Sequence, residues 1–382
     1  MRLKSTLLFA SAVLLLNNSF AQTHVKTNGK KYTLIEEATG TWCGWCPDGA
    51  QVLEQSVEPN FPRANIVSWH NGDGLELSGD PFCTGSGYIT GFPLGTVNRF
   101  SWPSGGIQQD RGKWVNDCIT DSSTTPKFDV SMTCTYDTGT RLLKIAVTGK
   151  ALSALTGQWN INAYIVEDSI SSSVEAQHSY LNPTGTMCAN GQPSWFVGKG
   201  SPITPSWYSH MNVVMNVMAT GGSIWGDSSF KNPAINTSYT KNYTYTIPTT
   251  SNYKMVKVVG MVQKYGATTS DRAIENSIKA WVKTMWKNTT NVSAINSAIS
   301  EVELYPNPAG NYVTVGCQLG APSAMDITIS NSLGQKVSEN HYAAGSNNFS
   351  EQVSLSNLSN GIYFMTLNSN GEKVTKRFVV SK

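Results

Sequence analysis

Two cysteines separated by two residues are the clearest chemical feature of the sequence. Cys43 and Cys46 lie in Thr41-Trp-Cys-Gly-Trp-Cys-Pro47, where a strand is expected to run into a helix. Thiols at this spacing can close a small disulfide ring, and the positive end of a helix favours the thiolate of the first. We expect Cys43 to attack a substrate disulfide and the more buried Cys46 to resolve the mixed disulfide.

Two other interpretations of this pair stay open. A Cys-x-x-Cys can be half of a zinc site, but the sequence has no second one and its five His residues are scattered, so no metal site is expected. A purely structural bridge is the other alternative, because extracellular binding proteins can keep such a fold without catalysis. No cofactor is expected.

The elements around the pair predict a mixed α/β domain over residues 22–125. Glu36 and Glu37 precede the motif on a strand and are expected to face solvent, so no buried proton acceptor is assigned. A strand, a helix and a second strand in succession indicate a βαβ unit. The expected elements are strands at 31–38, 65–70 and 95–100, a helix at 47–57 that starts with Pro47, and a short helix at 80–89.

The motif Trp42-Cys-Gly-Trp-Cys-Pro47 after a strand resembles that of the thioredoxin superfamily. The resemblance implies a thioredoxin-like N-terminal domain with a cis-proline loop facing the disulfide. Pro93 is the cis candidate, and Phe92 before it would pair with a substrate peptide. An ordinary trans turn proline is the alternative. Trp45 stands where the superfamily often has Pro or His, which leaves the redox potential open.

A longer resemblance covers residues 30–285 and points to the outer-membrane-protein-28-related family. It implies a thioredoxin-like domain joined to a β-sandwich on surface or secreted bacterial proteins, with adhesin-like binding as one suggested role. Trp42, Trp45 and Phe92 are candidate binding residues, and His70 is either a base or a structural histidine. The matching segments are 37–47, 67–70, 80–82, 90–99, 209–214 and 225–227.

Residues 126–286 predict an all-β domain of the immunoglobulin-like sandwich type. Apolar and polar residues alternate over several separated runs, for example at Phe128, Val130, Met132 and Cys134. A helix at 271–286 is expected to close the domain. The stretch 178–209 is rich in Gly, Pro and Trp, and its aromatic residues belong either to the core or to an exposed binding surface.

The C-terminal region predicts a small β-sandwich after a polar linker at 287–300. Asn370-Gly371 between two alternating runs is a strong hairpin signal. Residues 301–382 resemble a type IX secretion sorting domain, through 304–315, 332–337, 360–367 and 376–380. That resemblance implies recognition by the outer-membrane translocon as partner; a generic adhesion module is the alternative.

The N-terminus predicts export. Arg2 and Lys4 precede an apolar run from Leu7 to Leu16, and small residues allow cleavage after Ala21, so residues 1–21 are interpreted as a signal peptide. The run is shorter than the ~20 residues of a spanning helix. A net charge of +3 over 382 residues gives no reason to expect a nucleic-acid partner.

The sequence therefore predicts a multi-domain protein, α/β followed by all-β, at the cell surface (associated with the outer membrane) or secreted. One hypothesis is thiol–disulfide exchange with a protein disulfide as substrate. The other is a non-enzymatic, adhesin-like protein that binds a surface ligand and keeps the fold as a scaffold. Seven Cys make an odd number in an oxidising compartment, so at least one of Cys83, Cys118, Cys134, Cys188 and Cys317 is free or pairs between chains.

Overall fold

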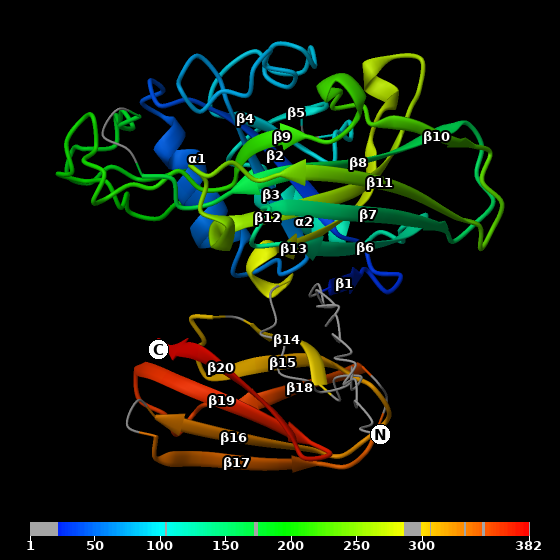
Figure 1. Cartoon of the computed structure of the whole chain (residues 1–382). Helices are drawn as coiled ribbons and strands as arrows, with labels where there is room; N and C mark the ends of the chain where they lie inside the picture. The colour runs from blue at the N-terminus through cyan, green and yellow to red at the C-terminus, as the bar shows by residue number, and fades with distance from the viewer. Residues whose placement is uncertain are drawn as a thin grey trace, which may run out of the picture.

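The computed structural model describes residues 22–381 apart from 104, 172–174, 286–298, 306, 332–333 and 346–347. The expected signal peptide at 1–21 and most of the expected linker at 287–300 lie outside the described residues. Figure 1 shows a larger body formed by residues up to 285 and a smaller body formed from residue 299 onward. Both are rich in β-structure, as expected for a multi-domain β-rich chain.

The larger body is built on a nine-stranded sheet in the order β13-β12-β8-β9-β3-β2-β4-β5, with β10 paired to β8. The centre is parallel, because β2 pairs with β3 and β3 with β9 in the same direction, whereas β4 runs antiparallel to β2. The strands are β2 (Thr33–Thr39), β3 (Ala64–His70), β4 (Leu94–Val97), β5 (Gln108–Asp110), β8 (Gln158–Glu167), β9 (Val213–Val217), β10 (Asp227–Lys231), β12 (Val256–Lys264) and β13 (Ile274–Trp281).

This sheet crosses the boundary expected at 125/126. Strands β2 to β5 precede that boundary, and β8, β9, β10, β12 and β13 follow it, yet they share one set of hydrogen bonds. Arg99, fully buried after β4, joins the halves: its guanidinium donates to both carboxylate oxygens of Glu36 on β2 at 2.6 Å and to the Tyr164 hydroxyl on β8 at 2.7 Å. The predicted N-terminal and middle domains are therefore fused through their sheet.

The remaining four strands form a second sheet, β1-β6-β7-β11, with bounds Gln22–Lys26, Phe128–Tyr136, Leu142–Ala151 and Ser238–Thr246. Every second residue of β6 is buried, as its alternation predicts. These side chains share a core with Ile161 of β8 and Val258 of β12. The two sheets thus form a sandwich at the β8–β12–β13 end of the nine-stranded sheet.

Two expected helices are wrong. Residues 274–281 form strand β13, preceded by the 3₁₀ turn η4 (Thr269–Asp271) and followed by η5 (Val282–Met285). Ile274, Ile278 and Ala280 face the core at strand spacing, and pairing with β12 overrides their helix propensity. Residues 80–89 form a series of turns in which Asp80 caps the N–H groups of Cys83 and Thr84.

Two α-helices of the described residues cover one face of β2, β3 and β4. Helix α1 (Cys46–Val52) begins with Pro47 in its first turn and continues as the π-helical turn η1 (Leu53–Val57), which agrees with the helix expected at 47–57. Helix α2 (Trp114–Ser122) lies beside it. Their apolar side chains share a core with Ile35, Ile66 and Val97 of the sheet. Two further 3₁₀ turns are η2 (Thr220–Gly222) and η3 (Tyr253–Met255).

The smaller body is a sandwich of two antiparallel sheets with its own core. Asn370 and Gly371 both have positive φ, 52° and 81°, which is the backbone that a two-residue hairpin turn between β19 and β20 requires. The sheets are β14-β15-β18 (Ile299–Tyr305, Tyr312–Leu319, Asn348–Ser354) and β17-β16-β19-β20 (Lys336–Tyr342, Met325–Asn331, Gly361–Ser369, Glu372–Val380). No helix of the described residues is long and apolar enough to span a membrane.

Candidate functional site

The two cysteines of the motif form a disulfide between the end of β2 and the start of α1. Cys43 and Cys46 are joined with a Cα–Cα separation of 5.4 Å. Cys46 is fully buried at the first position of α1, and Cys43, three residues earlier, is 5% exposed. This order of burial is the one that the sequence predicts for an attacking and a resolving thiol.

The loop that faces the motif contains the expected cis-proline. The Phe92–Pro93 peptide bond is cis, and it directly precedes β4 beside β2. The Phe92 ring packs edge-on against Trp42 at 5.2 Å between centroids. Trp42 is fixed in turn by its Nε1–H, which donates to the carbonyl of Asn71 at 2.7 Å. One aromatic pair therefore flanks the disulfide on its cis-proline side.

The other side of the disulfide is covered by a segment that local sequence patterns do not connect with the site. We call residues 175–210 the strap. The Gln177 Nε2 donates to the carbonyls of Gly40 at 3.1 Å and Cys43 at 2.9 Å, and the Tyr180 N–H donates to the Gly44 carbonyl at 2.8 Å. The Tyr180 ring lies so close to Gly44 that a Cβ there would be 2.5 Å from it. Glycine is the residue that this contact admits between the cysteines.

The strap also contacts helix α1. The Ala189 N–H donates to Oδ1 of Asp48 at 2.8 Å, and the Trp195 N–H donates to Oε1 of Gln51 at 2.9 Å. Leu181, Cys188, Phe196 and Ile203 give the strap a small core of its own. The strap is therefore an ordered part of the site, although Tyr180, Trp195 and Trp207 project from it and are 62%, 45% and 60% exposed.

The expectation that Glu36 and Glu37 face solvent is wrong, because both are buried. Both faces of β2 are covered, so alternation along this strand carries no information about exposure. Glu37 lies under α1: a Cβ on Gly49, one turn after Cys46, would be 2.4 Å from its Oε1 and 3.2 Å from the Cβ of Pro93. Burial raises the pKa of Glu37 to about 8, against a lowering by the hydrogen bond from Ser68.

His70 is the last residue of β3 and contacts the motif loop through Asp73. Its Nδ1 lies 2.8 Å from Oδ2 of Asp73, and the same carboxylate oxygen accepts the Thr41 N–H at 2.8 Å. Burial raises the pKa of Asp73, but hydrogen bonds from His70, Thr41 and Leu75 outweigh it and lower the pKa. His70 thus orients Asp73, which holds the loop before Cys43. These contacts support the structural alternative for His70.

The other five cysteines make no disulfide within the described residues. Cys83, Cys118, Cys134, Cys188 and Cys317 are free and buried. Burial raises the pKa of each thiol, to about 12 for Cys134 and Cys188 and to about 11 for Cys317. Desolvated thiols of this kind are inert, which sets them apart from the Cys43–Cys46 pair.

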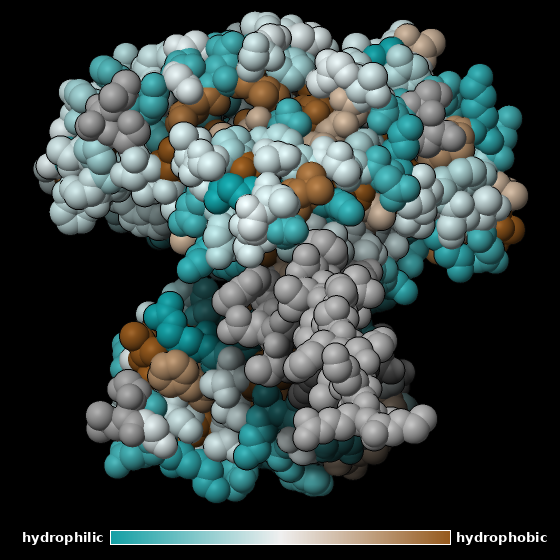
Figure 2. All heavy atoms as spheres, viewed as in Figure 1, coloured by the Kyte–Doolittle hydropathy of each residue, from teal (hydrophilic) through white to brown (hydrophobic). Residues whose placement is uncertain are grey.

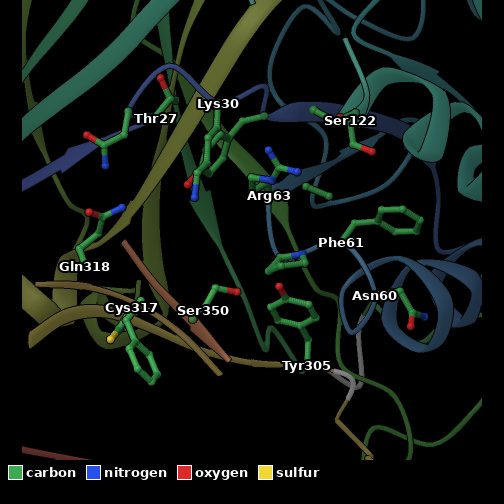
Figure 3. Close-up of a pocket in the computed structure, with 17 residues that line it drawn as sticks. Thr27, Lys30, Asn60, Phe61, Arg63, Ser122, Tyr305, Cys317, Gln318 and Ser350 are labelled. Atoms are coloured by element: carbon green, nitrogen blue, oxygen red, sulfur yellow. The ribbon is translucent and has the colours of Figure 1, made fainter. Parts of the chain in front are cut away.

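The surface of the molecule and a further cavity lie apart from the two cysteines of the motif. The face in Figure 2 is mainly polar, with hydrophobic residues emerging in separate groups on the larger body. Figure 3 shows a cavity of about 430 Å³ with Lys30 and Arg63 on one side and Tyr305 and Gln318 on the other. Neither cysteine of the motif lines it.

Comparison with solved structures finds weak likeness over most of the chain. HBP35 of Porphyromonas gingivalis is 19% identical, with a TM-score of 0.49 over 92% of this chain and 99% of that one. Escherichia coli alpha-2-macroglobulin activated by porcine elastase is 10% identical, with a TM-score of 0.20 over 75% of this chain and 26% of that one. A search of curated proteins finds no match.

The C-terminal body gives a definite match. Residues 303–381 match the family described as secretion system C-terminal sorting domain, which confirms the sorting domain expected from the sequence. Such a domain implies export to the cell surface or the medium, and interaction with the type IX secretion machinery. The chain is therefore a β-rich, multi-domain protein that carries a type IX sorting domain at its C-terminal end.

Proposed function

We propose that this chain is an exported thiol–disulfide exchange protein in which Cys43 is the nucleophile and Cys46 the resolving thiol. The observation that carries the proposal is the Cys43–Cys46 disulfide at the start of α1, the helix whose Gly49 packs on the buried Glu37 and on the cis-Pro93 loop. A buried carboxyl with a raised pKa under the helix that carries the resolving thiol is suited to accept and return protons.

The exchange transfers two electrons between the protein and its substrate and needs no cofactor. The Cys43 thiolate attacks a substrate disulfide, so that a Cys43–substrate S–S bond forms while the substrate bond breaks and one substrate sulfur leaves as a thiolate. Cys46 then loses its proton and attacks the Cys43 sulfur, which releases the second substrate thiolate. The substrate gains two electrons and the protein dithiol becomes a disulfide. The relative reduction potentials of protein and substrate set the direction.

The arrangement of the N-terminal elements supports a thioredoxin-like domain over residues 22–125. Parallel β2 and β3 are connected through α1, β4 and β5 follow as an antiparallel pair, and α2 packs beside α1. The segments that resemble the outer-membrane-protein-28-related family also meet here, since Ser68 of β3 pairs with Val213 of β9. Phe92 beside the disulfide is the proposed contact for an extended substrate, with Trp42 and Trp45 flanking it.

The test is a trap in the full chain. In Cys46→Ser, Cys43 can still attack a disulfide, but the resulting mixed disulfide cannot be resolved. After incubation with a disulfide-linked peptide, we therefore expect a stable Cys43–peptide disulfide, detected by mass spectrometry. Cys43→Ser is the matched control and should capture nothing. Wild-type protein should reduce insulin with dithiothreitol as electron source. No capture and no insulin reduction, or a Cys43–Cys46 potential well below about −300 mV, would identify a structural bridge instead.

A second candidate, non-enzymatic surface binding, is favoured by the exposed rings of the strap. Tyr180, Trp195 and Trp207 are large aromatic side chains exposed on one segment, and Tyr and Trp are enriched at interaction surfaces. Replacing Trp195 and Trp207 with Ala leaves the cysteines intact. Loss of adhesion to immobilised matrix protein or polysaccharide in this variant, with exchange unchanged, would support binding. Deleting residues 126–292 is unsuitable as a test, because it removes the strands that complete the sheet.

A further inference from the structure

A small cavity under α1 connects Glu37 with a second acidic side chain, Glu54. The cavity measures about 20 Å³, which is room for the centre of a single water. Glu37 lines it from β2 and Glu54 from η1, while Ser68 lies on β3. The strap closes the cavity with Tyr208 and His210.

One oxygen of Glu37 needs a partner that the described residues do not supply. The Ser68 hydroxyl donates to Oε2 at 3.0 Å, but Oε1 has no hydrogen-bond partner among the described residues. Glu37 is only 3% exposed, so leaving Oε1 unpaired would carry a desolvation cost. A water placed in the adjoining cavity would satisfy this oxygen, and Glu54, which also lines the cavity, is the candidate second partner.

Glu54 lies between this cavity and the outside. It lines the inner cavity and also an open hollow of about 390 Å³, together with Glu58, Pro59 and Pro62. Glu54 alone belongs to both sets of lining residues. Its carboxyl group is therefore the connection between the buried water position and solvent.

Burial and the surrounding charges bring the pKa of both carboxyl groups close to neutral pH. Burial, and to a smaller extent the charge of Glu54, raises the pKa of Glu37 to about 8, against a lowering by the hydrogen bond from Ser68 and by the charge of Arg111. Burial also raises the pKa of Glu54 to about 7, followed by repulsion from Glu58 and Asp168. The nearby cations form ion pairs with other carboxylates, Lys257 with Asp168 at 3.0 Å and Arg111 with Asp48 at 2.5 Å, although Arg111 still lowers the pKa of Glu37. His210 is neutral at pH 7, because burial lowers its pKa to about 4.

We propose that a water held between Glu37 and Glu54 relays protons between the disulfide helix and solvent. This inference rests on the exchange function proposed above. When Cys46 attacks Cys43, the Cys46 proton passes to the Glu37 carboxylate, and the sulfur–sulfur bond to the substrate breaks. Glu37 then returns to its ionised form by passing a proton through the water to Glu54, which releases it at the outer hollow. Glu54 is a positioning residue, because it acts through Glu37.

The first arm of the test reads Glu37 without any exchange activity. The full chain, with glutamate labelled by ¹³C at the side-chain carboxyl carbon, is titrated by NMR in the disulfide form as wild type, Glu54→Gln and the matched control Glu58→Gln. Because Glu54 lies next to Glu37 and raises its pKa, Glu54→Gln should lower the pKa of Glu37 by about half a unit or more. Glu58→Gln should leave it nearly unchanged. An identical Glu37 titration in wild type and Glu54→Gln overturns the proposal.

The second arm measures the resolving step. The reduced full chain is mixed with an excess of glutathione disulfide, and release of the mixed disulfide is followed from pH 5 to pH 9. Loss of general acid–base assistance costs typically 10²-fold or more, so a relay residue acting through Glu37 should cost about tenfold at pH 7. Glu54→Gln should also lose the inflection that wild type shows near the pKa of Glu54, whereas Glu58→Gln should keep an inflection, moved to lower pH because Glu58 no longer raises the pKa of Glu54.

The outcomes separate the two proposals. Wild type that forms no mixed disulfide contradicts the exchange function, and the NMR arm still decides whether Glu37 and Glu54 are coupled. If the wild type exchanges and Glu54→Gln shows the same pH profile as the wild type, Glu54 has no part in the mechanism and Glu37 acts without it. A reduced rate with an unchanged pH profile means that Glu54 is structural, which also overturns the relay.

Discussion

The side-chain amide of Gln177 donates a hydrogen bond to the main-chain carbonyl of Cys43 at 2.9 Å, across a sequence separation of 134 residues. The same nitrogen reaches the carbonyls of Gly40 and Thr41. The two N–H bonds of this buried amide are therefore shared among three carbonyls of the motif loop, which, in chain order, also accept a main-chain N–H from Cys43, His178 and Cys46.

Replacing Gln177 with Ala should destabilise the protein by about 0.5–1.5 kcal/mol, because the loop carbonyls lose their side-chain donor while they keep their main-chain donors. It should also make the Cys43–Cys46 disulfide reducible by dithiothreitol at a higher rate, since the strap no longer fixes the loop. Urea unfolding and reduction kinetics measure the two effects. Gln192→Ala, exposed on the same strap, is the control. Equal values for the two variants would show that the strap does not restrain the loop.

The raised pKa of Glu37 predicts how stability depends on pH. Its ordinary value is 4.5 and its folded value about 8, so between these limits the folded state keeps a proton that the unfolded state has lost. This stabilising contribution is complete below about pH 4.5 and is lost as pH rises towards 8, with a slope of at most about 1.4 kcal/mol per pH unit. Glu37→Gln should flatten that slope in urea unfolding between pH 5 and pH 8.

The matched control for this measurement is Glu339→Gln, since Glu339 is an exposed carboxylate in the smaller body. It should reproduce the wild-type slope. A Glu37→Gln variant with the wild-type slope would mean that Glu37 titrates at its ordinary pKa, and the proton-accepting role proposed for it would then lose its physical basis.

The buried pair of Arg99 and Glu36 predicts a strongly non-additive mutant series. Arg99→Met leaves the Glu36 carboxylate buried without its cation and should cost about 3–5 kcal/mol. Glu36→Leu together with Arg99→Met removes both charges and should recover part of that loss. Guanidinium unfolding of the two single variants and the double variant gives the coupling free energy. Additive costs would show that Arg99 and Glu36 do not stabilise the fold as a pair.

The thiols predict a definite labelling pattern. Native protein in the disulfide form should react negligibly with a maleimide, because the five free cysteines are buried and the pKa of each thiol is raised by burial. Unfolding without reductant should expose five thiols, and unfolding after reduction all seven. Mass spectrometry counts the labels. Fewer than five in the first unfolding experiment would reveal a second disulfide.

Local patterns predicted the parts of the site that are close in sequence. The cysteine pair and Pro47 in the first turn of α1 follow from residue type and spacing, whereas cis-Pro93 was implied by the resemblance to the thioredoxin superfamily. The strap could not be predicted in this way, because Gln177 and Tyr180 reach the motif only through the fold. Glu37 was missed for a related reason: exposure follows alternation only where one face of a strand is open, and both faces of β2 are covered.

The shared sheet also has a kinetic consequence. The Tyr32 N–H just before β2 donates to Oδ1 of Asn276, 244 residues later, and Nδ2 of Asn65 on β3 donates to the Ser277 hydroxyl, 212 residues later. The chain must close loops of this length, at a cost in conformational entropy, before the stabilising contacts can form. The sheet is therefore expected to form slowly. Cys43 and Cys46, three residues apart, can meet long before the sheet exists. Oxidation of the pair therefore does not report that folding is complete, whereas burial of Asn276 does.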